Sequence, residues 1–289
     1  MSKRTKAEAL LVCITLIWGA TFVVVKGALG YASPLSFISI RFTVAGILLL
    51  LVLGRGRIDR QALLPGLLLG LFLGFGYLCQ TTGLVQTTAS KSAFITGFSV
   101  ILVPLIEVAR GARLRPALVV GAMLGLAGIY FLVMPSSFQG VNRGDVLTLL
   151  ASMSFAVHIV LVGHYARQHS FLHLVPVQVL FVGLGAFALL PLRGGLELHP
   201  SPRLVFALAV TALLATGLAF TVQNWAQQYT PASHAALIFS LEPVVAVLTS
   251  RLVNGEQLGR RVLMGSLLTL GGMVVAEVWG GSPPSAVEG

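Results

Sequence analysis

The sequence predicts an all-α integral membrane protein in which ten transmembrane helices form two inverted five-helix repeats around a central cavity. Composition is the first observation, because 56% of the 289 residues are hydrophobic and only 10% are charged, whereas soluble domains carry about 25% charged residues. The apolar residues also form about ten blocks of roughly 18 to 22 residues, each long enough to cross about 30 Å of hydrocarbon. The third observation is an internal repeat.

The internal repeat relates residues 74–93 to a stretch 143 positions later in the chain. The matched pairs are Gly74 and Gly217, Gln80 and Gln223, Thr87 and Thr230, Ala89 and Ala232, Ser90 and Ser233, and Ala93 and Ala236. Each copy has an apolar helix with one glutamine, a Thr-x-Ala-Ser turn and a second apolar helix. A duplication of this kind is typical of membrane proteins built from two related halves.

The first repeat is assigned to residues 1–140. Its expected spans are residues 8–27, 34–53, 64–86, 92–110 and 116–134. The first span ends at Lys26 without a signal-peptide cleavage pattern, so we interpret it as a retained helix. The third span carries Gly66, Gly70 and Gly74 at every fourth position, a spacing that allows close helix packing.

The second repeat is assigned to residues 141–280, and residues 281–289 form a flexible tail. Its expected spans are residues 145–163, 172–192, 204–227, 233–252 and 261–279. A weaker alignment at an offset of 137 pairs Trp18 with Phe155, Thr21 with His158 and Arg41 with Gln178. It supports the duplication without establishing it.

The loop charges predict the orientation. Nine basic residues share one face: Lys3, Arg4, Lys6, Arg55, Arg57, Arg60, Arg110, Arg113 and Arg115. In the second half the opposite face carries Arg193, Arg203, Arg251, Arg260 and Arg261, while Arg167 alone joins the first group. An odd number of spans per repeat inverts the second copy and explains this distribution. We expect both termini in the cytoplasm and the chain in the inner membrane of a bacterium.

Two buried glutamines are the leading candidate site residues. Gln80 and Gln223 each lie about six residues, or about 9 Å of helix, before a Thr-x-Ala-Ser turn, which places them on either side of the membrane midplane. An amide both donates and accepts hydrogen bonds, so the pair could bind the carboxylate and ammonium of a zwitterion. Hydrogen bonding between helices is the alternative.

Aromatic and polar residues share the faces of these glutamines. Tyr77 and Phe220 lie one turn earlier and could form a stacking wall, or they could be ordinary core aromatics. Asn224 and Gln227 extend the polar face of the eighth span, and such a face avoids lipid.

Five further residues are candidates for the cavity. Trp18 and Thr21 lie one turn apart on the first span, although Trp18 could simply pack. His158 could relay protons, but a packing role is favoured. Phe98 and Ser99 are expected to face the cavity because they are equivalent to Leu241 and Glu242.

Four charges lie inside the spans or nearly so: Arg41, Glu107, Glu242 and, at a helix end, Lys91. Each needs a partner or water, because an unpaired charge costs at least about 2.5 to 3.5 kcal/mol on insertion scales. Glu242 could carry a coupling proton, bind an ammonium group or form a structural pair. Arg41 is the one deep arginine, and a structural partner is favoured over a ligand contact.

Missing motifs exclude other functions. No phosphate-binding glycine loop and no His/Cys/Glu cluster with metal spacing occurs in the sequence, so no cofactor or metal is expected. The net charge of +10 resides in loops, which argues against nucleic-acid binding. An enzyme built on His158 and Glu242 would lack a second acid, base or metal ligand.

Four short motifs occur in a characteristic order: Trp18-Gly19-Ala20-Thr21-Phe22, Thr88-Ala89-Ser90, Leu241-Glu242-Pro243 and Gly255-Glu256. With these motifs the chain resembles the EamA type of the drug/metabolite transporter superfamily. The resemblance covers nearly the whole chain. It implies a substrate cavity lined by the third, fourth, eighth and ninth helices together with the first and sixth. Within the superfamily the chain is most similar to the YddG-like amino-acid and metabolite exporters. Ser99 and Ala112 replace the acids Glu242 and Glu256 of the second copy, so the cavity is expected to be asymmetric in charge.

The expected function is therefore secondary export of small metabolites, in particular neutral and aromatic amino acids, by a monomer working through alternating access. Exchange of phosphorylated or nucleotide-linked sugars is an alternative, but it would need several deep cations and only Arg41 is present. A passive pore and a membrane-embedded enzyme also remain open.

Overall fold

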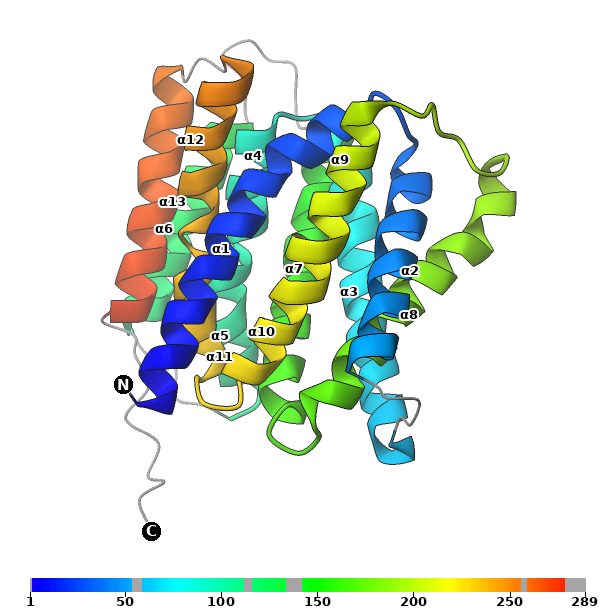
Figure 1. Cartoon of the computed structure of the whole chain (residues 1–289). Helices are drawn as coiled ribbons and strands as arrows, with labels where there is room; N and C mark the ends of the chain where they lie inside the picture. Colours follow the sequence, from blue (N-terminus) through cyan, green and yellow to red (C-terminus); the bar gives the residue numbers. More distant parts are fainter. Residues whose placement is uncertain (1, 54–58, 112–115, 134–141, 256–258, 279–289) are drawn as a thin grey trace.

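A computed structural model describes residues 2–53, 59–111, 116–133, 142–255 and 259–278 of the chain (Figure 1). The described residues form helices and no strand beyond an isolated bridge between Ala32 and Leu198. The first half contains α1 (Lys3–Ala28), α2 (Pro34–Val52), η1 (Arg60–Ala62), α3 (Leu63–Leu84), α4 (Ala89–Gly97), α5 (Ser99–Ala109) and α6 (Pro116–Val133).

The second half repeats this order with more interruptions. It contains α7 (Arg143–Tyr165), α8 (Phe171–Leu189), η2 (Leu190–Arg193), α9 (Pro202–Val210), the π-helix η3 (Thr211–Leu218), α10 (Ala219–Ala226), α11 (Ala232–Phe239), α12 (Glu242–Asn254) and α13 (Arg260–Val278). The predicted tail at 281–289 lies outside the described residues.

Eight helical units in the described part of the chain are long and apolar enough to cross a membrane. Large apolar side chains remain exposed on the outer surface, such as Leu64 at 67%, Phe206 at 62% and Leu252 at 85%. Hydrocarbon, unlike water, solvates such a surface. The prediction of an all-α membrane protein is thus confirmed. Two further apolar helices, α6 and α13, pack against each other, and a count of ten crossings stays a prediction.

The two halves run in opposite directions. At the upper end of Figure 1, Lys26 near the end of α1 donates to the carbonyl of Leu84 at 2.7 Å, and a methyl group at Gly83 would lie 2.7 Å from the carbonyl oxygen of Gly144 at the start of α7. The beginning of α1 lies instead at the lower end, where Arg4 contacts His234 of α11. The first helix of one half therefore ends where the first helix of the other half begins.

Small residues bring the halves together. A methyl group placed on Gly70 of α3 would lie 2.8 Å from the ring of Phe181 and 2.9 Å from the carbonyl oxygen of Gln178, both on α8. Such distances leave no room for a larger side chain. The expected close packing at the glycines of the third span is therefore present, and its partner is α8.

Three expected spans are interrupted rather than continuous. The fourth is divided at Phe98 into α4 and α5, and the ninth is divided before Glu242 into α11 and α12. These breaks fall at equivalent positions of the two copies, and Pro243 in the second copy lacks the amide hydrogen that would continue the helix. The eighth span contains η3, which a regular apolar pattern does not reveal.

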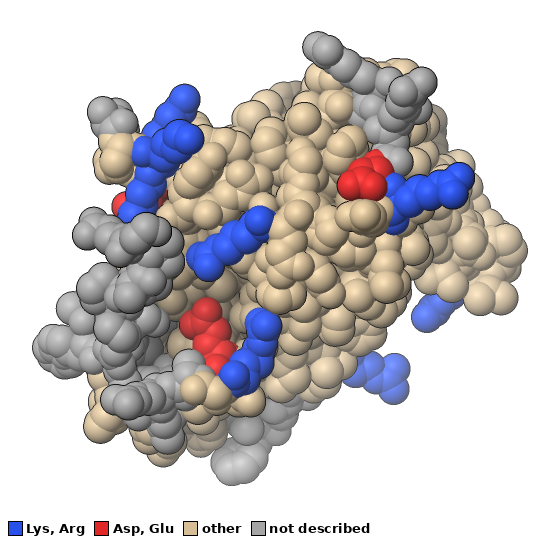
Figure 2. Space-filling model, turned by 90° about the horizontal axis from the view of Figure 1, so that it is seen from below, with Lys and Arg blue, Asp and Glu red and all other residues tan. Residues whose placement is uncertain are grey.

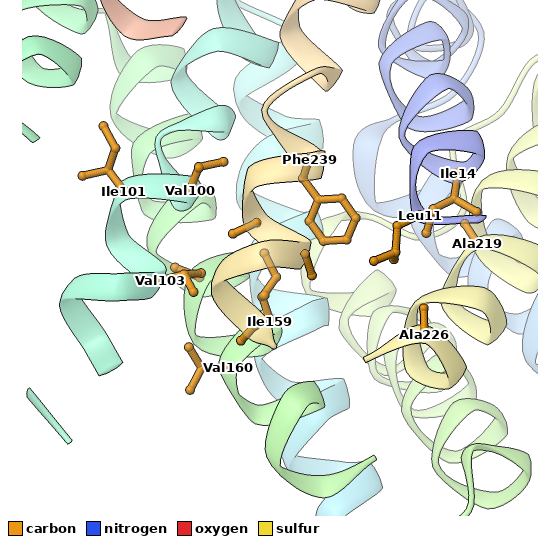
Figure 3. Packing of buried hydrophobic residues seen from close by; sticks show 14 of the residues in the cluster. Leu11, Ile14, Val100, Ile101, Val103, Ile159, Val160, Ala219, Ala226 and Phe239 are labelled. Carbon is orange, nitrogen blue, oxygen red and sulfur yellow. The ribbon is translucent and has the colours of Figure 1, made fainter. Parts of the chain in front are cut away.

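Apolar packing fills the lower half of the molecule, below the centre. Phe239 of α11 projects toward the side of Leu11 and Ile14 on α1, and Ile159 and Val160 of α7 lie below it in this view (Figure 3). The lower face carries mainly Lys and Arg among its charged side chains (Figure 2). The described chain begins and ends at this end, with Ser2 and Val278 (Figure 1).

Candidate functional site

A cavity lies between the two halves. Its walls come from α1, α2, α3, α4, α5, α7, α10, α11 and α12, so both repeats contribute. Most of the residues singled out in the sequence line it: Trp18, Thr21, Arg41, Tyr77, Gln80, Ser99, His158, Phe220, Gln223 and Glu242. The fold thus brings together side chains that are up to about 220 positions apart in the sequence.

Arg41 supplies a buried positive charge to this cavity. Its Nε donates to the hydroxyl of Thr216 at 2.8 Å, and its terminal nitrogen lies 3.5 Å from the hydroxyl of Tyr77. The guanidinium group also lies over the rings of Phe42 and Tyr77, with its carbon 5.1 and 4.8 Å from the two centroids. No carboxylate of the described chain lies within ion-pair distance of it. Arg41 therefore has the neutral partners Thr216 and Tyr77, and a role in ligand binding stays a prediction.

Glu242 supplies the opposite charge. It is the first residue of α12, and its carboxylate lines the cavity without a hydrogen bond or ion pair to another described side chain. The positive end of a helix dipole stabilises an acid in the first turn. The break before α12 therefore presents a carboxylate to the cavity, and the equivalent break before α5 presents the neutral Ser99.

The two glutamines lie in different hydrogen-bond environments. The Nε2 of Gln80 donates to the hydroxyl of Thr96 at 3.2 Å. The Nε2 of Gln223 donates to the Oε1 of Gln227 at 3.0 Å, whereas the Oε1 of Gln223 is buried and has no partner in the described chain. Buried acceptors are nearly always satisfied. This oxygen is therefore a buried acceptor that no described residue satisfies.

Aromatic rings form the apolar wall of the cavity. Tyr77 contacts the rings of Phe155 and Phe220 edge-on, with centroids 5.3 and 6.2 Å away. Trp18 contacts Phe220 at 5.5 Å and Phe239 at 5.3 Å. These contacts join the aromatic residues of the two repeats into one surface beside the charged groups, which suits an organic solute with an apolar side chain.

The π-helix η3 fixes two residues of this site. The indole Nε1 of Trp18 donates to the carbonyl oxygen of Ala215 at 2.8 Å, and Arg41 bonds the hydroxyl of Thr216. The wider turn of a π-helix leaves backbone groups available, and such segments often occur at functional sites. Sequence reasoning missed Thr216 and Ala215, since no motif or spacing distinguishes them from other small residues of the span.

His158 lies on the cavity wall but is already engaged. Its Nε2 is 2.9 Å from the Oε1 of Gln178, and its side chain is 2% exposed. Gln178 occupies the position equivalent to Arg41. In the second repeat a His158–Gln178 pair therefore occupies the region where the first repeat has Arg41.

Three expected site residues do not line the cavity. Phe98 is buried in the apolar cluster that includes Ile101 and Val103, because the break before α5 turns it away from the centre. Asn224 donates to the carbonyl oxygen of Phe220 at 2.9 Å, and Gln227 donates to the carbonyl oxygen of Ile159 at 3.0 Å. Both side chains are buried and pack next to residues that line the cavity.

Within the described residues, no group of three metal-binding side chains occurs.

Comparisons with known proteins agree with this architecture. Residues 5–134 and 142–277 each match the EamA-like transporter family. An uncharacterized transporter of Archaeoglobus fulgidus is 34% identical over 279 residues, which cover 96% of this chain and 87% of that protein.

More distant relatives have similar lengths. The uncharacterized transporter YoaV of Bacillus subtilis is 26% identical, covering 89% of this chain and 92% of that protein. The uncharacterized inner membrane transporter YedA of Escherichia coli K12 is 27% identical, covering 86% and 83%. A solved crystal structure superposes with a TM-score of 0.70 at 19% identity over 95% of this chain and 97% of the other, a likeness of fold alone.

Proposed function

Because this chain belongs to the EamA-like transporter family, we propose that it exports small zwitterionic metabolites, with neutral and aromatic amino acids as the substrate class, by alternating access. It is a multi-pass membrane protein of a family of transporters rather than enzymes. The observation that carries the proposal is the pair of opposite charges in one cavity, Arg41 and Glu242, neither of which is neutralised by an ion pair within the described chain.

Each charge has a defined role in this proposal. Arg41, held by Thr216 and Tyr77, binds the substrate carboxylate, since guanidinium groups form strong charge-assisted hydrogen bonds with carboxylates. Glu242 binds the ammonium group. In the empty carrier Glu242 takes up a proton instead, so that substrate and proton compete for one carboxylate and move in opposite directions.

The neutral residues refine the fit. The free Oε1 of Gln223 accepts a hydrogen bond from the ammonium group, and Gln80 contacts the substrate from the other repeat. Tyr77, Phe220 and Trp18 contact the apolar side chain of the substrate. Thr21 and Ser99 complete the wall, and His158 packs against Gln178 without carrying protons.

The orientation in the membrane is proposed from the charge distribution, and the monomeric state from the internal repeat. The basic lower face is assigned to the cytoplasm by the positive-inside rule, with both termini on that side of an inner membrane (Figure 2). One chain supplies both repeats, and these are assigned to residues 1–140 and 141–280. A monomer therefore suffices for the transport cycle.

Flux into liposomes tests the proposal. The purified full chain is reconstituted with and without a pH gradient, and a panel of labelled amino acids, sugar phosphates and organic cations is offered. We expect saturable transport of neutral and aromatic amino acids, stimulated by the gradient. Flux of sugar phosphates alone, non-saturating flux or no flux above empty vesicles would overturn it.

A further inference from the structure

Two polar contacts at opposite ends of the molecule are related by the internal repeat. At an offset of 143, Lys91 of α4 corresponds to His234 of α11. At an offset of 137, Glu8 of α1 corresponds to Asp145 of α7. Lys91 contacts Asp145 at the upper end, and His234 contacts Glu8 at the lower end. Each contact joins the first helix of one repeat to the turn that follows the glutamine-bearing helix of the other. We call them the upper latch (Lys91 and Asp145) and the lower latch (Arg4, Glu8 and His234).

The upper latch is buried and strong. The Nζ of Lys91 lies 2.9 Å from the Oδ2 of Asp145, whose side chain is 1% exposed. The same carboxylate accepts from the backbone nitrogen of Asn142 at 3.2 Å and lies 3.5 Å from the hydroxyl of Thr87. A buried carboxylate held by several donors does not separate from its cation easily.

The lower latch differs in chemistry and exposure. Arg4 donates from Nε to the Oε1 of Glu8 at 2.8 Å and from a terminal nitrogen to the Nδ1 of His234 at 3.0 Å. His234 and Glu8 are 4.0 Å apart, and their side chains are 33% and 34% exposed. Arginine only donates hydrogen bonds, so the Nδ1 of His234 must be an acceptor and the ring must be neutral. Protonation of Nδ1 would remove this bond.

Charges around His234 determine what protonation does. On α1, Lys3 and Lys6 lie over the rings of Tyr229 and Trp225, so Glu8 is the single carboxylate among three neighbouring cations. Of the other described helices packed on α11, α5 carries Glu107, whose charged neighbours are Arg110 and Arg167. Helix α7 carries His158, which contacts Gln178, and His164, which contacts Gln168, with Arg143 and Asp145 at its opposite, upper end. Helix α13 carries Arg260 and Arg261, also at the upper end. Protonation of His234 would therefore remove the hydrogen bond from Arg4 and bring two positive charges together, beside a Glu8 carboxylate that also pairs with Arg4.

We propose that the two latches close opposite ends of the central cavity in alternation and that protonation of His234 opens the lower latch. This inference rests on the proposed alternating-access function. The upper latch contains no histidine, whereas the lower latch contains His234, and histidine is the side chain whose charge ordinarily changes between about pH 5 and 8. Acidification at the lower face then favours the state whose cavity is open to that face. Exposed contacts of this kind shift an equilibrium by about two- to fivefold.

Distance measurements across each latch test the proposal. Spin labels are attached to the full chain in lipid nanodiscs, with Cys13→Ser and Cys79→Ala as background. The lower pair is Ala9→Cys with Gln228→Cys, and the repeat supplies the matched upper pair, Val146→Cys with Val85→Cys. On moving from pH 7.5 to 5.5, a step of about the histidine range, we expect the long-distance fraction to rise about two- to fivefold at the lower pair and not at the upper pair.

Substitutions identify the group responsible. His234→Gln keeps an acceptor for Arg4 and cannot titrate, so the pH response should disappear, while His164→Gln, also at the lower end, should keep it. Glu8→Gln should lengthen the lower distance at both pH values, and Asp145→Asn should lengthen only the upper one. A pH response that survives in His234→Gln, or an equal response at both ends, overturns the inference.

Flux measurements separate this inference from the proposed function. A lower-pair response that depends on His234, in a protein that transports nothing from the panel, supports the latch and rejects the substrate class. Saturable flux with no change in the lower distance rejects the latch and leaves the function standing.

Discussion

The two repeats place helices in the same order around the cavity but different side-chain chemistry on it. At equivalent positions the first repeat has Arg41 and Ser99, and the second has Gln178 and Glu242. The first therefore supplies the positive charge and the second the negative one. Backbone symmetry provides two related conformations, and the differences between side chains provide a site with a defined polarity. The substitutions below remove or sharpen that difference.

Arg41→Gln gives the first repeat the residue type that the second repeat has at the equivalent position, Gln178. This substitution should have the largest effect on transport. Loss of a charge-assisted hydrogen bond costs about 1.5 to 3 kcal/mol, so the KM for an amino acid should rise about 10- to 100-fold. KM is measured in liposomes, with the exposed Arg193→Gln as control. An unchanged KM in folded Arg41→Gln would assign Arg41 a structural role after all.

Glu242→Gln removes the charge of the second repeat while keeping its shape. Without a titratable carboxylate, the stimulation of transport by a pH gradient should be lost, and gradient-driven flux should fall about tenfold. Substrate exchange without a gradient should fall less. The exposed Glu197→Gln serves as control. Persistence of the gradient effect in Glu242→Gln would exclude this residue as the proton carrier.

Alanine at Gln80 or Gln223 tests the groups that the repeats share. A neutral hydrogen bond contributes about 1 kcal/mol, so each variant should raise KM about three- to tenfold without lowering the folded yield. Gln223→Ala should have the larger effect, because its free Oε1 is the buried acceptor without a partner. Gln86→Ala, an exposed glutamine in the turn after α3, is the control. A wild-type KM in both variants would show that Gln80 and Gln223 pack between helices and do not bind the substrate.

Phe98→Leu should have the smallest effect on transport. Phe98 packs in the apolar cluster instead of lining the cavity, so KM should change less than about twofold while the free energy of unfolding falls by about 1 kcal/mol. Thermal unfolding in detergent measures the second quantity. A large change in KM with unchanged stability would show that Phe98 lines the cavity, as its equivalence to Leu241 predicts.

These features differ in how far the sequence alone predicts them. The second expected span, residues 34–53, corresponds to α2 at Pro34–Val52, and the sixth, residues 145–163, lies within α7 at Arg143–Tyr165. The equivalence of Gln80 and Gln223 predicted two amides in one cavity, and both line it. The breaks beside Phe98 and Glu242 were not predicted, because a broken apolar helix has the same composition as a continuous one.

The sequence by itself determined that this chain is an all-α membrane protein with a duplicated unit, since span length and repeat spacing are local properties that lipid selects directly. Only the tertiary structure decided that Arg41 meets Thr216 and Tyr77 instead of Glu242, and that Glu8 faces His234 while Asp145 faces Lys91. Those side-chain contacts depend on how each helix is rotated about its axis and on the angles at which packed helices cross. Glycine contacts and the π-turn of η3 set that geometry, and hydropathy does not encode it.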